Sequence, residues 1–258
     1  MLSCLYPSRR QIKSQRGFTL AELAVVLIIV GLIIGGVVKG QELIDSARRT
    51  AIWREVQSFK APVYTFQDRY QALPGDLNDE IARDLLGVPG GDGNGVIGGL
   101  LDSASVDLAA NSPRVNENRH FWNHLTAAGL IPGTTKLSAE QIDRAGNVQF
   151  RSLFPSSRVP AAGYSSLRMT SDAGTPTART AYWLRLHRIS GGAPAAPALS
   201  PQLAAALDRQ HDDGKPNSGA IRAHDSTVEG YSRCRTPGAP DRYETHADNA
   251  CVMLFELF

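Results

Sequence analysis

A single carboxylate lies inside the most apolar stretch of this sequence. From Phe18 to Val38 the chain runs for 21 residues in which only Thr19 and Glu22 are polar. A carboxylate within a bilayer costs roughly 2–3 kcal/mol even on a lenient scale, so it needs a partner. No lysine or arginine lies within the run. Cleavage after Gly17 would create a cation, because the new α-amino group of Phe18 would be four residues, about one helical turn, from Glu22.

Two cysteines near the C-terminus form a second candidate pair. Cys234 and Cys251 lie close together, whereas Cys4 precedes the apolar run. In an oxidising compartment the two later cysteines can pair and close the polar segment between them into a loop. Such a closure contributes roughly 3 kcal/mol in the chain-entropy model. Two unpaired, partly buried thiols are the alternative. We expect the disulfide if this part of the chain leaves the cytoplasm.

Two glycine-rich segments carry acidic residues in an arrangement similar to that of calcium loops. GGDGNG places Asp92 and Asn94 two residues apart, and HDDGKPNSG contains Asp212 and Asp213. Carboxylate and amide oxygens are ligands that calcium prefers, but the first segment lacks the downstream acids and the bidentate glutamate of an EF-hand. Glycine-enabled turns are therefore expected, calcium is the alternative at both places, and the sequence predicts no other cofactor.

The apolar run has the length of a transmembrane helix. At ~1.5 Å per residue it would span about 31 Å, close to the ~30 Å of a hydrocarbon core. Four basic residues and no acidic residue precede it (Arg9, Arg10, Lys13 and Arg16), which predicts a cytoplasmic N-terminus. A secretory signal would have a shorter apolar region followed by a cleavage site. Here the polar sequence KGQELIDSARR follows directly, so we expect segment 18–38 to remain in the mature protein.

The net charge argues against a nucleic-acid partner. The chain has 27 basic and 25 acidic residues and a formal charge of +2. Four of the basic residues lie before residue 18, so the 23 that follow face 25 acidic residues and give −2. A chain of that charge exerts no overall attraction on DNA.

An apolar stripe extends the helix beyond the membrane. Its members are spaced alternately four and three residues apart: Ile52, Val56, Phe59, Val63, Phe66 and Tyr70. This is the period of an amphipathic helix, and the stripe needs a surface to cover, most simply the face of a sheet. We expect one helix over 18–70 with a bend at Pro62. A coiled-coil stalk would need more heptads than the pattern provides.

The remainder, 71–258, is expected to form one globular domain. Segment 71–118 is rich in Gly, Asp, Asn and Pro and predicts a long loop with at most a short helix over 79–86. Further elements follow from periodicity and caps: helices over 121–130, from 138 and over 200–208, strands over 148–154, 181–189 and 251–258, and an exposed link over 191–199. Together they predict an α+β fold, a long helix on a small antiparallel sheet with long loops.

The start of the apolar run carries a family resemblance. Gly17-Phe18-Thr19-Leu20-x-Glu22, after a basic leader and before an apolar helix, resembles the class III signal of type IV prepilins and type II secretion pseudopilins. The resemblance implies a pilin-like fold and a leader, 1–17, that prepilin peptidase removes on the cytoplasmic side. The peptidase would then methylate Phe18. Glu22 would neutralise the amine of an adjacent subunit.

The same resemblance implies where the protein works and with what. Its partners would be other pilin or pseudopilin subunits and an inner-membrane assembly platform. It would cross the inner membrane once, with a periplasmic C-terminal domain, and then enter the filament of a Gram-negative bacterium. The motifs LPGD, GDGNG and DDGKPNSG with the late cysteine pair also resemble a set of prepilin-like proteins, in scattered pieces of the globular half.

A structural filament subunit is the predicted function, and no catalysis is expected. The length and the long loops favour a minor or specialised subunit over a compact major one. A pilus-tip adhesin and a DNA-uptake minor pilin are the alternatives. A membrane-anchored periplasmic enzyme is a more remote one, because Gly-x-Ser-x-Gly and His-Glu-x-x-His motifs and a phosphate-binding glycine loop are all absent. Secretion, motility, competence and adhesion machines share the same signal, so it selects none of them.

Overall fold

The computed structural model of the chain describes residues 19–98, 113–132, 154–172, 175–190, 193–226, 229–236 and 241–258. They fall into two units that are described separately, one ending at Ile44 and the other covering Asp45–Phe258. The leader, the helix expected from Ser138 and the expected strand at 148–153 lie outside the described residues.

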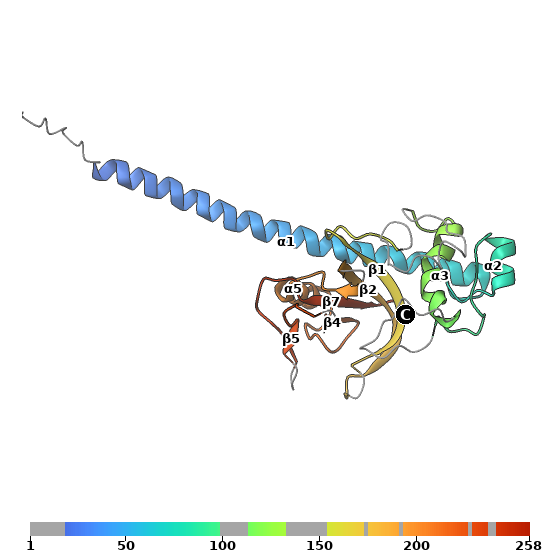
Figure 1. The fold of residues 1–258 in the computed structure, drawn as a ribbon. Helices are drawn as coiled ribbons and strands as arrows, with labels where there is room; N and C mark the ends of the chain where they lie inside the picture. Colours follow the sequence, from blue (N-terminus) through green and yellow to red (C-terminus); the bar gives the residue numbers. More distant parts are fainter. Residues whose placement is uncertain are drawn as a thin grey trace, which may run out of the picture. The chain divides into compact units, whose positions relative to one another are not determined.

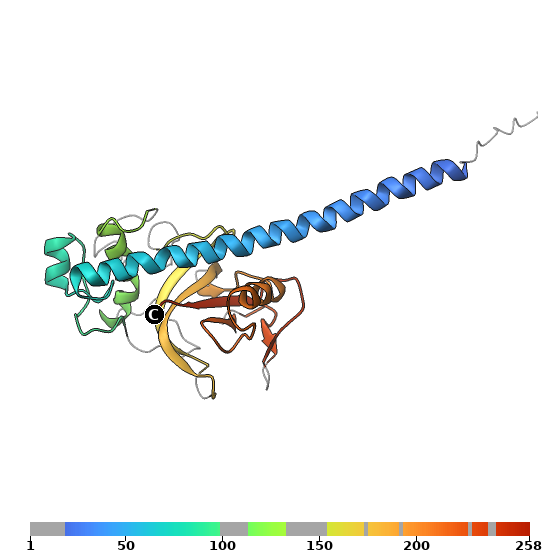
Figure 2. The ribbon, with the colours of Figure 1, turned by 180° about the vertical axis from the view of Figure 1, so that it is seen from behind.

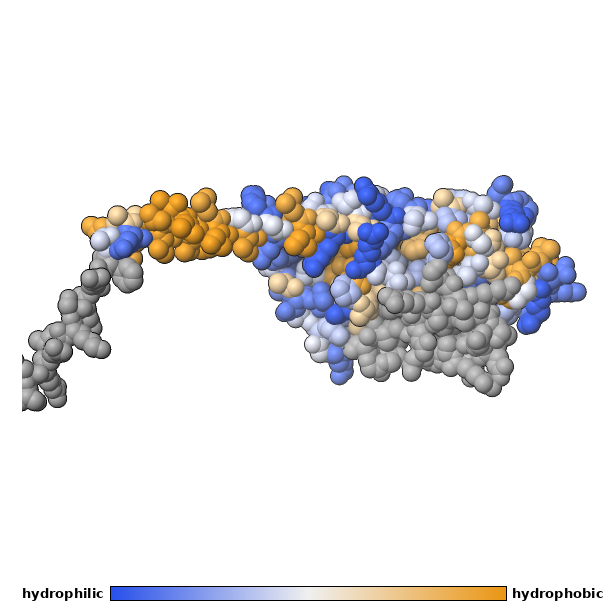
Figure 3. Space-filling model, turned by 90° about the horizontal axis from the view of Figure 1, so that it is seen from above, coloured by the Kyte–Doolittle hydropathy of each residue, from blue (hydrophilic) through white to orange (hydrophobic). Residues whose placement is uncertain are grey.

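Helix α1 (Leu20–Tyr70) comprises 51 residues and continues through Pro62 (Figure 1). Its beginning and end agree with the predicted helix to within two residues. In the first unit its large apolar side chains are exposed, from Leu20 at 88% to Val30 at 44%. Figure 3 shows these residues as a continuous apolar surface along the first part of the helix.

The second part of α1 buries the predicted stripe. Ile52, Val56, Val63 and Phe66 are at most 1% exposed and belong to the main core, against which Phe59 packs. A polar contact fixes the same stretch: Glu55 accepts hydrogen bonds from the hydroxyl groups of Ser157 and Tyr164 at 2.8 and 2.9 Å and from the Arg158 amide at 3.1 Å. The stripe thus covers a sheet, as its period predicts.

The sheet of the second unit is antiparallel: four strands form a path, and a fifth strand pairs with the second strand of that path. Figure 2 shows the sheet from behind, with its strands coloured from yellow to red. In spatial order the path is β1 (Ala162–Ser171), β2 (Arg179–Ser190), β7 (Cys251–Glu256) and β4 (Ile221–Asp225), and β3 (Ala193–Ala196) pairs with β2. Leu184 and Leu186 of β2 belong to the core that contains the α1 stripe, whereas Trp183 belongs to a smaller apolar cluster. The prediction of strand β2 is confirmed, and the predicted C-terminal strand is the internal strand β7.

Besides the second part of α1, the described residues of the second unit form the helices α2, α3 and α5. α2 (Asp79–Leu85) agrees with the prediction, and α5 (Pro201–His211) begins after Ser200, whose side chain accepts from the Leu203 amide. α3 (Pro113–Ala127) begins eight residues before the expected start at 121, so the prediction of a loop up to residue 118 was wrong there. Its polar first half shows no apolar period that the sequence could reveal.

The alanine- and proline-rich segment before α5 is a second correction. It was expected to be an exposed link, but 193–196 form β3, and Ala196, Ala198 and Leu199 are at most 2% exposed. The Ala198 and Leu199 amides donate to the Cys251 carbonyl, at 2.9 and 3.3 Å. Small side chains allow this close approach of one backbone to another, which composition alone does not distinguish from an exposed linker.

The two late cysteines form the expected disulfide. Cys234 and Cys251 are joined, with Cα atoms 4.7 Å apart, and both are fully buried. The bond ties the short ribbon of β5 (Arg235–Thr236) and β6 (Arg242–Tyr243) to the first residue of β7. It therefore links a peripheral loop to an internal strand of the sheet.

Candidate functional site

The first turn of α1 contains a reciprocal set of hydrogen bonds. The backbone N–H and the hydroxyl of Thr19 donate to Oε2 of Glu22, at 2.8 and 3.0 Å. In return the Glu22 amide donates to Oγ1 of Thr19 at 3.3 Å. The Leu23 amide then donates to the Thr19 carbonyl, the first bond of the helix ladder. This is a capping box, with Thr19 as N-cap and Glu22 three residues later.

The capping box supplies acceptors for backbone N–H groups at the helix start, which otherwise have no partner within the helix. The first N–H groups of a helix have no carbonyl one turn back, and a bilayer offers no water to replace it. Among the described residues no hydrogen bond ends on Oε1 of Glu22. Gly17 and Phe18 lie outside the described residues, so the predicted pairing of Glu22 with the Phe18 amine stays a prediction.

The described residues contain one helix that is long and apolar enough to cross a membrane, and it is α1. None of the apolar window that qualifies it is buried. A family model for the prokaryotic N-terminal methylation motif matches residues 12–38, from the basic segment to the end of the apolar run. The chain carries a prepilin-type signal.

The prepilin-type signal is that of type IV pilins and pseudopilins, and it supports a substrate of prepilin peptidase of that kind. With the long helix on a small antiparallel sheet, the architecture is α+β and pilin-like. The apolar helix and the signal together fit an anchor in the inner membrane. The chain has no significant match among curated proteins or solved structures.

The first calcium candidate lies in a loop held by buried carboxylates. Asp92 has carboxylate oxygens within 4.8 Å of those of Asp76 and Glu117. Asp76 accepts from the Asn94 and Gly95 amides at 3.0 and 2.9 Å. Glu117 accepts from the amides of Asp92 and Gly98 at 3.0 and 2.5 Å. Asn94 uses its side chain within the loop, donating to Asp92 at 2.8 Å.

The glycines of this loop make the expected turns. Gly93 and Gly95 have positive φ of 73° and 84°, which side chains other than glycine rarely adopt. Burial raises the pKa of Glu117 to about 7, and the nearby carboxylates Asp92 and Asp76 add to the shift. The sequence did not point to Glu117, because it lies in a polar stretch of an unexpected helix. Calcium binding here stays a prediction.

The second calcium candidate gains a buried acid from α5. Asp212 and Asp213 have oxygens within 4.8 Å of Asp208, which is fully buried. Asp208 accepts from the Tyr243 hydroxyl at 2.8 Å and from the Gly214 amide at 3.1 Å. Burial raises the pKa of Asp208 to about 7, helped by its two acidic neighbours. These contacts describe a tight turn after α5, and a metal at this place is also still a prediction.

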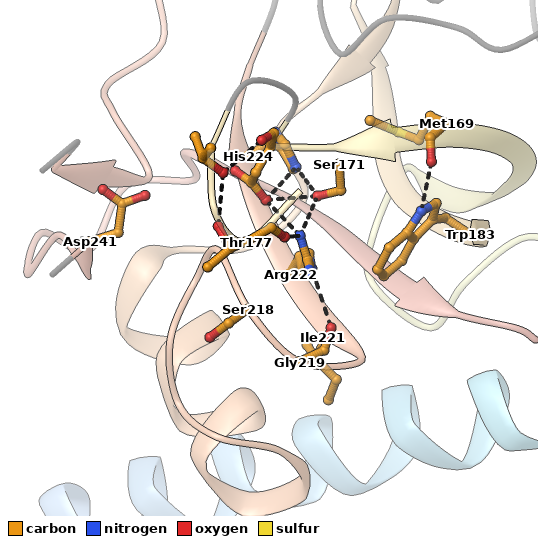
Figure 4. A network of polar contacts seen from close by, with 12 residues as sticks. Met169, Ser171, Thr177, Trp183, Ser218, Gly219, Ile221, Arg222, His224 and Asp241 are labelled. Atoms are coloured by element: carbon orange, nitrogen blue, oxygen red, sulfur yellow. Dashed lines mark hydrogen bonds and ion pairs between the residues drawn. The ribbon is translucent and has the colours of Figure 1, made fainter. Parts of the chain in front are cut away.

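A group of Ser, His and Asp side chains at the end of β1 has the residue types of a hydrolase but not the arrangement. His224 Nε2 lies 3.1 Å from Ser171 Oγ (Figure 4). The same nitrogen lies 4.0 Å from Oδ2 of Asp172. A catalytic triad needs the serine and the acid on opposite ring nitrogens, whereas here both face the same one. Ser171 is also fully buried, out of reach of a substrate. The group is therefore structural in its geometry.

Two arginines, Arg222 and Arg235, bind the carboxylate of Asp172 in this group. Arg222, 3% exposed, donates to the Thr177 carbonyl at 2.7 Å (Figure 4). It also donates to Asp172 at 3.1 Å. Arg235 donates to the other oxygen of Asp172 at 2.7 Å. Burial by itself would raise the pKa of Asp172, but His224, the Ser171 hydroxyl and Arg235 outweigh it and lower the pKa. The network joins β1, β4 and the disulfide-closed ribbon.

Proposed function

We propose that this protein is a structural subunit of a type IV pilus or of a type II secretion pseudopilus. In this proposal prepilin peptidase cuts after Gly17 and methylates the new N-terminus at Phe18. The observation that carries it is that the signal matched over 12–38 passes directly into a 51-residue helix whose apolar first unit is exposed. A helix of that kind requires a bilayer or the helices of neighbouring subunits around it.

The proposed path begins in the inner membrane. The N-terminus faces the cytoplasm, the domain from Asp45 onward is periplasmic, and the helix later moves from the lipid into the filament core. The disulfide between Cys234 and Cys251 supports an oxidising compartment for this domain. The partners are other pilin or pseudopilin subunits, the peptidase and the inner-membrane assembly platform.

We further propose a minor or specialised subunit. The support is segment 71–132. In the order of the chain, this segment adds α2, the glycine-rich loop and α3 after α1 and before the first strand of the sheet. A subunit repeated throughout a filament must fit its neighbours at every position, whereas a subunit with a special position is free of that constraint and has room for such an addition. This part of the proposal concerns abundance and leaves the processing step unchanged.

Processing is the step to test. The full chain is produced in membranes with active prepilin peptidase, and its mass and N-terminal sequence are determined. Membranes with an inactive peptidase are the control. We expect a chain that starts at N-methylated Phe18 only when the peptidase is active. A chain that starts at Met1 in both membranes would overturn the proposal, as would one that starts beyond Val38, which would make the run an ordinary secretory signal.

A further inference from the structure

The capping box at the start of α1 uses one oxygen of Glu22, Oε2. Both donors of Thr19 converge on Oε2, while Oε1 has no hydrogen-bond partner among the described residues. We propose that Thr19 is a positioning residue for assembly: it holds the Glu22 carboxylate at the helix start with Oε1 presented to the amine of an adjacent subunit. This inference rests on the proposed function and adds how the Glu22 carboxylate is oriented for assembly.

The two hydrogen bonds from Thr19 restrict the rotamer of the Glu22 side chain. A glutamate side chain in the first turn has several rotamers, and most of them point outward or along the helix. Accepting the Thr19 amide at 2.8 Å and hydroxyl at 3.0 Å selects the one that turns back past the N-cap. The carboxylate then lies beside the backbone N–H of Thr19, at the first described residue of the chain.

The box also explains how the carboxylate is accommodated in the membrane before any amine is available. Charge-assisted hydrogen bonds to two donors offset part of the cost of removing a carboxylate from water. The box needs only residues 19–22, so it can form in the uncleaved chain and persist after cleavage. Pairing with an amine then adds a bond at Oε1 without breaking those at Oε2.

Substitutions at the two positions separate capping from charge. Thr19→Val keeps the size and branching of the side chain but removes its hydroxyl, and Thr19→Ser keeps the hydroxyl. Glu22→Gln keeps an acceptor that a capping box accepts but removes the charge, and Glu22→Ala removes both. Thr65→Val is the matched control, because Thr65 is an exposed threonine of α1 whose hydroxyl donates to the Ala61 carbonyl of the same helix.

The first measurement tests the box itself. The full chain, labelled with ¹⁵N-threonine, is placed in detergent micelles, and hydrogen exchange of the Thr19 amide is followed by NMR. We expect exchange to be at least about tenfold faster in Glu22→Ala than in the wild type and nearly unchanged in Glu22→Gln. Equal exchange in the wild type and Glu22→Ala would overturn the inference, whether or not the peptidase cuts the chain at Gly17.

The second measurement tests positioning. The fraction of cleaved subunit recovered in sheared filaments is compared among variants whose processing at Phe18 has been verified by mass. We expect Thr19→Val to lower this fraction about fivefold or more, Thr19→Ser to restore it, and Thr65→Val to leave it unchanged. If Thr19→Val assembled like the wild type while Glu22→Gln did not, Glu22 would pair without help from Thr19. The positioning role would then be wrong, and the proposed function would stand.

Discussion

The start of α1 and the end of β1 each surround one carboxylate with donors, but the donors come from different distances. Glu22 is held by Thr19, three residues away in the sequence. Asp172 is held by Arg222 and Arg235, which are 50 and 63 residues away. A local contact can form in a single helix before the rest of the chain folds. A long-range contact exists only in the folded domain, so its loss must be felt in the stability of that domain.

The largest effect is expected at Asp172. Asp172→Asn removes the charge that pairs with buried Arg222, while asparagine tolerates the positive φ of 55° at this position. An uncompensated buried charge destabilises a domain by about 3–5 kcal/mol. Urea unfolding of the full chain in detergent, followed by tryptophan fluorescence, measures the loss. Arg83→Ala, which breaks the exposed pair with Asp79, is the control and should cost less than about 1 kcal/mol.

Equal effects of Asp172→Asn and Arg83→Ala would contradict the distinction between buried and exposed pairs. The network would then contribute no more to the folded domain than a surface ion pair does, and the contrast with the local box at Glu22 would disappear.

The disulfide is a second long-range link and should have an effect of similar or slightly smaller size. Cys234 and Cys251 are 17 residues apart, and closing such a loop contributes roughly 3 kcal/mol in the chain-entropy model. Replacing both by alanine should lower the urea midpoint, and dithiothreitol should then have no further effect. Cys4→Ala serves as the control and should leave both the midpoint and its response to dithiothreitol unchanged. A midpoint unaffected by the double replacement would show that the contacts of the ribbon hold it without the bond.

Asp208 is a buried carboxylate whose neighbours are acids, whereas the buried carboxylate of Asp172 is surrounded by arginines. The folded pKa of Asp208 is raised to about 7, against roughly 4 for an unfolded aspartate. The native state therefore binds more protons than the unfolded state between these values. The contribution is fully present below about pH 4 and is lost as the pH rises through about 7.

The prediction at Asp208 follows from that sign. Asp208→Asn keeps an acceptor for the Gly214 amide and supplies a donor to Tyr243, so it imitates the protonated acid. From pH 5 to 8 the wild type should lose about 2 kcal/mol more of its free energy of unfolding than the variant loses. Urea midpoints at the two pH values provide the test, with Asp84→Asn as a control at an exposed carboxylate of α2. Parallel pH profiles for the wild type and Asp208→Asn would contradict the raised pKa.

The smallest effect is expected at Thr19, if the capping box is local. Thr19→Val should change the free energy of unfolding of the second unit, measured by urea unfolding, by less than about 0.5 kcal/mol, because helix-end contacts act over one turn. Its effect should appear instead in filament assembly. A large loss of domain stability in Thr19→Val would break the comparison, because it would tie the helix start to the core of the second unit.

Elements whose pattern is contained in one stretch of sequence were predictable. The alternate spacing of Ile52 to Tyr70 gave the second part of α1, and Ser200 before Pro201 gave the start of α5. The alternation around Trp183 gave β2. β1 was not predicted, because most of its residues are buried, including Ser165 and Ser166, and no apolar–polar alternation remains.

The sequence alone determined the apolar span and the period of the buried stripe, because each depends on a pattern within one helix. The capping box of Thr19 and Glu22 was not predicted and was found in the structure. The sequence also indicated Asp92, Asn94, Asp212 and Asp213 as loop residues. Only the tertiary structure decided which carboxylates join them, Glu117 in one loop and Asp208 in the other, and which arginines surround Asp172. The physical reason is that these contacts gain their energy when packing removes water from groups distant in sequence, and no local pattern records which groups those are.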